Sequence, residues 1–129
     1  IDTKTKCLHW VRAGHDPAIF YDPRTDTLEE LRGAGIALGV DMDGHFAQYQ
    51  KTNLKKGQII LLGSDGLWEA RNSGGKMFGK ETIYEITRKH ADASAREILT
   101  SCFHEFNIFL GERAPEDDVT LVVIKITED

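Results

Sequence analysis

The stretch IILLGSDGLWEARNS, residues 59–73, decides how the rest of the sequence is interpreted. Four large aliphatic residues form a short strand of buried character, and the turn residues Gly63, Ser64, Asp65 and Gly66 follow at once. An aspartate in such a turn either punctuates the chain or presents its carboxylate at the rim of a sheet. The sequence on either side has to distinguish these two roles.

Most of the first half of the chain has strand character. The alternating residues 7–13, the turn cluster GHDP at 14–17 and the apolar residues 18–21 predict a β-hairpin. Residues 33–40 are too rich in glycine for a helix and predict a tight connection. Further strands are expected at 27–31, 46–50, 58–62 and 119–126.

Two helices are expected between the last two strands. Residues 80–90 carry apolar side chains at helical spacing, and Ser94 with Glu97 forms a capping box at the start of a second helix. An apolar stripe of about four turns follows, made of Leu99, Cys102, Phe103, Phe106 and Leu110. Strands in two groups with the helices in one block predict an α+β fold, with helices packed on an antiparallel sheet.

Composition limits the classes of function. The 129 residues suit a single domain, and a net charge of −5 argues against nucleic acid or an anionic membrane as a partner. No apolar run is long enough to span a bilayer, and a cytoplasmic location is expected. Cys7 and Cys102 form no zinc or redox motif. Cys7 stands too close to Arg12, in a strand-like run, to form the phosphate loop of a cysteine phosphatase.

Two aspartates stand at the ends of the strongest strands. Asp65 follows the 58–62 strand and Asp117 precedes the 119–126 strand, so antiparallel pairing would bring both carboxylates to one edge of the sheet. Oxygen ligands suit a hard cation such as Mg²⁺ or Mn²⁺. Glu69 and Asp118 are candidates for peripheral ligands. The alternative is that these are ordinary turn residues, and spacing alone leaves both open.

Four segments resemble the C-terminal part of the catalytic domain of the metal-dependent serine/threonine protein phosphatases (PPM, type 2C), in the branch typified by SpoIIE and RsbU. In chain order they are VRAGHDPAIFY (11–21), GIALGV (35–40), LKKGQIILLGSDGLWEARNSGGKMFG (54–79) and EDDVTLVVIK (116–125). The third and fourth segments are the most specific. The resemblance implies an antiparallel β-sandwich flanked by helices.

The resemblance also implies a site and a reaction. Asp65 and Asp117 match metal ligands, Gly66 is the small residue beside the metal, and Glu69 matches a ligand of a third metal in some members. Two Mn²⁺ or Mg²⁺ ions would activate water to attack phosphoserine or phosphothreonine, with no other catalytic side chain. The expected partner is a phosphorylated regulatory protein, an anti-anti-sigma-like protein in bacterial signalling. His15 departs from the family's metal-binding Gly-Asp step and is interpreted as a turn histidine bonded to backbone.

The resemblance predicts that residues 1–129 are the C-terminal part of one phosphatase domain. The bridging aspartate that the family carries in its N-terminal half has no match in this sequence, so this chain alone is expected to be inactive. The alternative is a catalytically incompetent module that binds a phosphoprotein. A half-domain that forms a homodimer to cover a sheet edge is a third interpretation.

Overall fold

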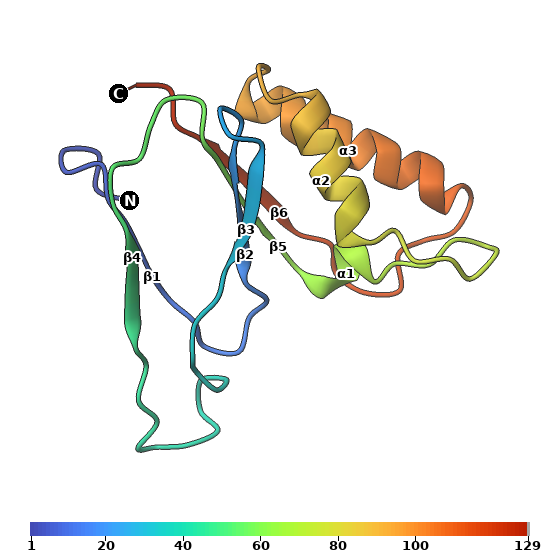
Figure 1. Ribbon diagram of the computed structural model, residues 1–129. Helices are drawn as coiled ribbons and strands as arrows, with labels where there is room; N and C mark the ends of the chain where they lie inside the picture. Colours follow the sequence, from blue (N-terminus) through green and yellow to red (C-terminus); the bar gives the residue numbers. More distant parts are fainter. Residues whose placement is uncertain (129) are drawn as a thin grey trace.

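A four-stranded antiparallel sheet forms the centre of the structure, a computed structural model in which residues 1–128 are described. Its strand order is β3–β2–β5–β6. The four strands are β2 (Ala18–Asp22), β3 (Thr27–Leu31), β5 (Ile59–Gly63) and β6 (Leu121–Lys125). A second sheet pairs β1 (Leu8–Val11) with β4 (Gln48–Lys51), and it lies on the opposite side of the central sheet from the helices (Figure 1). The predicted α+β fold with antiparallel sheets is confirmed.

Three helices lie between β5 and β6 in the chain: α1 (Asp65–Trp68), α2 (Lys80–Lys89) and α3 (Ala95–Leu110). The two long helices cover one face of the central sheet (Figure 1). The predicted capping box is confirmed, because Ser94 Oγ accepts from Glu97 N at 3.2 Å and Glu97 Oε2 accepts from Ser94 N at 2.8 Å. None of the helices in residues 1–128 has the length and apolar character needed to cross a membrane.

The predicted apolar stripe of α3 was displaced by one position at its start. Ile98, which the prediction omitted, is fully buried, whereas Leu99 and Phe103 are only partly buried. The buried residues of the helix are Ile98, Cys102, Phe106 and Leu110. Apolar residues occur on more than one face of this helix, and packing against the sheet selects the face that is buried.

Alternate side chains of the central sheet pack into two separate hydrophobic cores, one on each face of the sheet. Ile19, Tyr21 and Leu61 point to the helix side, where they pack with α2 and α3. Phe20 and Ile60 point to the other side and pack against residues that include Leu8 of β1. The central sheet is therefore covered by helices on one face and by the two-stranded sheet on the other.

The hairpin predicted over residues 7–21 was wrong. β1 pairs with β4, with Leu8 opposite Lys51, whereas β2 pairs with β3 and β5. The chain crosses from one sheet to the other through residues 12–17, where Gly14 has a φ of +89° and lies so close to Ala37 that a Cβ would be 2.8 Å from its Cα. Long-range partners therefore determined the pairing, although the turn itself was correctly located.

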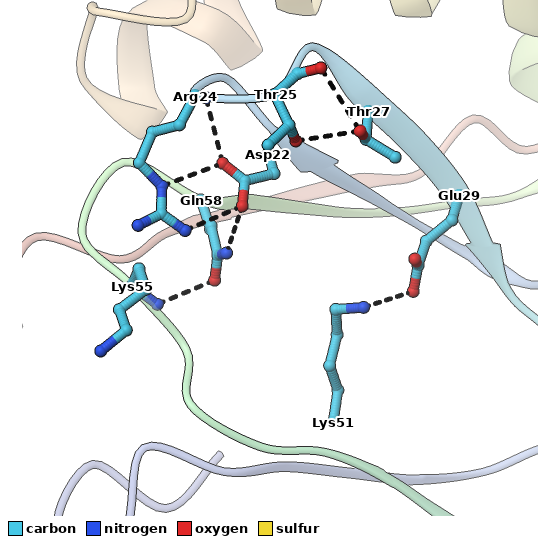
Figure 2. Close-up of polar contacts among 8 residues, drawn as sticks. All are labelled: Asp22, Arg24, Thr25, Thr27, Glu29, Lys51, Lys55 and Gln58. Carbon is cyan, nitrogen blue, oxygen red and sulfur yellow. Dashed lines mark hydrogen bonds and ion pairs between the residues drawn. The ribbon is translucent and has the colours of Figure 1, made fainter.

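A polar network fixes the end of β2 to the start of β5 (Figure 2). Asp22 Oδ2 accepts hydrogen bonds from Arg24 Nη2 at 2.9 Å and from Gln58 Nε2 at 2.7 Å. The Arg24 guanidinium, with help from Gln58, lowers the pKa of Asp22 from 3.8 to about 2. Gln58 is buried, and its Oε1 accepts from Lys55 N at 2.8 Å, so this polar side chain is satisfied on both sides.

Candidate metal centre

The strands β5 and β6 are antiparallel neighbours, as the sequence predicted. Their register places Ile59 opposite Lys125 and Gly63 opposite Leu121. The C-terminal end of β5 and the N-terminal end of β6 therefore lie at the same edge of the central sheet. Asp65 and Asp117 stand just beyond those two ends, so the geometric condition for a shared site is met.

Ser64 joins the two strand ends. Its Oγ donates to the carbonyl oxygen of Asp118 at 2.9 Å and accepts from Thr120 N at 3.0 Å. Its backbone N–H also donates to the Thr120 carbonyl at 3.0 Å. Three hydrogen bonds thus hold the turn after β5 against the residues before β6.

Gly66 brings α1 into direct contact with the same segment. A Cβ built on Gly66 would lie 2.4 Å from the carbonyl oxygen of Asp118 and 3.4 Å from the carbonyl carbon of Asp117. Both contacts are with backbone, which has little freedom to move away. A side chain at this position would separate the helix that begins with Asp65 from the loop that carries Asp117, so glycine is required for the close approach. The predicted turn after β5 continues at once into the single helical turn α1, which begins at Asp65.

The two aspartates line one polar pocket of about 310 Å³. Asp65 Oδ1 accepts from Gly66 N at 2.9 Å, and Asp117 Oδ1 accepts from Asp118 N at 2.7 Å. Within residues 1–128 no protein donor reaches the second oxygen of either carboxylate. The remaining lining residues are Gly66, Glu69, Ala70, Arg71 and Glu116.

The two candidates for peripheral metal ligands, Glu69 and Asp118, lie in different hollows of the surface. Glu69 lines this pocket, whereas Asp118 lines a neighbouring hollow formed by residues 115–119, and the role of either as a peripheral ligand stays a prediction. Asp118 contributes its carbonyl oxygen, which receives the Ser64 hydroxyl. Sequence reasoning missed Glu116 as a lining residue, although its position next to Asp117 was a usable signal.

The donor set fits a hard cation in part. Its carboxylate oxygens suit Mg²⁺ or Mn²⁺, and Mg²⁺ commonly takes one or two protein carboxylates while keeping several waters. Across the described part of the chain, however, no three His, Cys, Asp or Glu side chains are grouped closely enough to hold one ion. The two aspartates therefore fit as a share of a metal site, and their role as ligands stays a prediction.

The other residues singled out by sequence have structural roles. His15 Nδ1 donates to the Asp16 carbonyl at 2.9 Å, which confirms a turn histidine bonded to backbone. Cys7 is buried beside the bridge that it forms with Asp2. Trp68 is buried, with 4% of its surface exposed, and its ring packs on Gly63 below the turn. Arg113 Nη1 donates to the Asn72 carbonyl at 3.0 Å and links the two loops that flank the pocket.

An antiparallel α+β core with helices on one face is the fold of the type 2C protein phosphatase domains to which the chain is similar. The chain belongs to the SpoIIE family, because the family model described as Stage II sporulation protein E matches residues 1–127. The resemblance inferred from the sequence motifs is thereby confirmed.

Individual relatives agree with this assignment. The chain is 28% identical over 116 residues to the phosphoserine phosphatase RsbU of Bacillus subtilis, a match that covers 90% of this chain and 34% of RsbU. The SiaA-PP2C domain of Pseudomonas aeruginosa superposes with a TM-score of 0.80 at 25% identity, covering 97% of this chain and 48% of that one. The phosphatase domain of SpoIIE from Bacillus subtilis has the same fold, with a TM-score of 0.71 at 18% identity over 100% of this chain and 55% of that one.

Proposed function

We propose that the protein is a metal-dependent phosphatase that hydrolyses phosphoserine or phosphothreonine, with Asp65 and Asp117 among its metal ligands. The observation that carries the proposal is the meeting of two strand ends at one polar pocket. Membership of the SpoIIE family and similarity to a phosphoserine phosphatase support the reaction. The chain spans 34% of RsbU and 48% of the SiaA chain, so the activity is proposed for the catalytic domain to which these residues correspond.

Each side chain has a role in the proposal. When bound, Mn²⁺ or Mg²⁺ would supply positive charge for the phosphoryl oxygens and would lower the pKa of water. Asp65 and Asp117 would hold it through the oxygens left open by their backbone hydrogen bonds. Those backbone bonds fix the direction of each carboxylate. Among the described residues, Arg71 is the one cationic side chain that lines the pocket, and it would attract the dianionic phosphate.

The proposed substrate is a phosphorylated regulatory protein of the anti-anti-sigma kind, in the cytoplasm. The second candidate function is phosphoprotein binding without hydrolysis, on its own or as a homodimer. One observation favours it: within residues 1–128 no three His, Cys, Asp or Glu side chains are grouped closely enough to hold a metal ion.

A manganese titration by calorimetry tests the proposal. The 129-residue chain should bind Mn²⁺, and Asp65→Ala and Asp117→Ala should each weaken binding, whereas Asp43→Ala on an exposed turn should not. Equal affinity in all four proteins would show that the strand ends do not ligate a metal. Binding of a phosphoserine peptide in the absence of any Mn²⁺ binding would support the non-hydrolytic alternative.

A further inference from the structure

The side chain of Trp68 links the candidate metal ligand Asp65 to a distant turn. Trp68 ends α1, the single turn of helix that begins with Asp65. Its indole Nε1 donates to Asp16 Oδ2 at 3.0 Å. Asp16 belongs to the GHDP turn at 14–17, a part of the sequence that the candidate metal centre does not use. This turn lies between β1 and β2 and contacts α1 through that indole hydrogen bond.

Lys80, the first residue of α2, completes the contact. Its Nζ lies 3.2 Å from Asp16 Oδ2, 3.0 Å from Glu30 Oε1 and 4.7 Å from the centre of the Trp68 ring. The side chain of Lys80 is 24% exposed, and those of Asp16 and Glu30 are 37% and 20% exposed. One carboxylate oxygen of Asp16 thus accepts from both Trp68 and Lys80. Partial burial lowers the pKa of Lys80, but its ammonium donates to the Glu30 and Asp16 carboxylates, and these interactions outweigh burial and raise the pKa above its usual value.

The short helix α1 needs such support. A helix of four residues has no stability of its own, because nucleation costs more than so few hydrogen bonds return. Within it, Glu69 N donates to the Asp65 carbonyl at 2.8 Å, and Gly79 N donates to the Trp68 carbonyl at 2.8 Å just before α2. The C-terminal end of α1 is therefore held by β3, α2 and the 14–17 turn together, and its N-terminal end carries Asp65.

We propose that Asp16 and Lys80 are positioning residues that clamp Trp68 and thereby fix α1 and the Asp65 carboxylate against Asp117. The effect on metal affinity rests on the proposed function. The effect on the order of α1 does not. Neither residue lines the pocket that contains Asp65 and Asp117, so neither would contact a cation bound there, and the path by which they act is Trp68 and α1.

A matched pair of substitutions tests the clamp. Lys80→Met removes the charge and keeps most of the side-chain volume. Lys51→Met is the control, because Lys51 makes the same kind of contact elsewhere: its Nζ lies 2.7 Å from Glu29 Oε1 (Figure 2) and 4.4 Å from the centre of the Phe20 ring, and its side chain is 29% exposed. Two readouts are measured on the 129-residue chain, the exchange rate of the Glu69 amide hydrogen by NMR and the Mn²⁺ dissociation constant by calorimetry.

Lys80→Met should speed exchange at Glu69 and weaken Mn²⁺ binding by about tenfold each, as is typical when a residue that orients a metal ligand is lost. Lys51→Met should change neither readout. It should, however, lower the melting temperature of the chain by about as much as Lys80→Met does, because both substitutions remove the same kind of contact. Lys80→Arg should restore both readouts in part. Asp16→Asn, which keeps an acceptor for the indole and loses the ion pair, gives a second route if Lys80→Met does not fold, and it should shift both readouts in the same direction.

The outcomes separate the two proposals. Equal exchange rates and equal affinities in Lys80→Met and Lys51→Met would overturn the clamp and leave the metal site standing. A native chain that binds no Mn²⁺ would overturn the proposed metal site, and the amide exchange at Glu69 would then decide the clamp alone.

Discussion

Gly66→Ala is the substitution that tests most directly how the two strand ends are held together. The added methyl group would lie 2.4 Å from the carbonyl oxygen of Asp118, closer than such atoms approach in folded proteins. Either α1 or the Asp117–Asp118 backbone must move. Overpacking of this kind costs about 1–3 kcal/mol. Because both moving segments carry a candidate ligand, we expect Mn²⁺ affinity to fall along with the free energy of unfolding.

Gly74→Ala is the matched control for this prediction. Gly74 lies on the turn beside the pocket, and the nearest atom to its added Cβ would be Asn72 Oδ1 at 3.4 Å, an ordinary van der Waals distance. The two variants share the same chemical change, so the effect of alanine on the unfolded chain cancels between them. Urea unfolding and manganese calorimetry are measured on both. If Gly66→Ala unfolds at the same urea concentration as Gly74→Ala, or keeps native metal affinity, the close contact does not set the geometry of the site.

Two further substitutions test the supports around the site. Ser64→Ala should lower the free energy of unfolding by about 1–2 kcal/mol, because Thr120 N loses its acceptor. Ser73→Ala, on an exposed turn, is the control and should leave the free energy of unfolding unchanged. Equal urea midpoints for the two variants would contradict this prediction. Asp22→Asn should destabilise the chain by about 1–2 kcal/mol at neutral pH, allowing for solvent screening at the half-exposed Arg24. The pKa of Asp22 in the folded chain is lowered from 3.8 to about 2, so its contribution to the free energy of unfolding is complete above about pH 4 and is lost as the pH falls towards 2. The urea midpoints of the native chain and Asp22→Asn should therefore become equal near pH 2.

The edge of the sheet that carries the candidate site could be predicted because local signals agreed there. The apolar run at 58–62 and the turn at 63–66 mark a strand end, and the closing strand at 119–126 has the same character. Antiparallel pairing of those two strands was the one long-range assumption, and it is confirmed. The capping box at Ser94 was equally local and equally readable.

Other features depend on partners far away in the chain and could not be read locally. The hairpin over 7–21 failed because β1 finds a better partner in β4, and nothing in residues 7–13 specifies that choice. The fully buried face of α3 begins at Ile98 because the sheet selects one of several apolar faces. The hydrogen bond between Trp68 and Asp16 joins residues 52 positions apart, and neither residue type predicts it.

The antiparallel pairing of β5 and β6 also has a consequence for folding. Ser64 and Thr120 are 56 positions apart, so the pocket exists only once the loop that contains both long helices has closed. The unfolded chain therefore offers no preformed site, and a cation that binds at the pocket would stabilise the native state by mass action, by about 2.7 kcal/mol at a concentration one hundred times the dissociation constant. The melting temperature of the chain would then report metal concentration, and catalysis would not be needed to detect it.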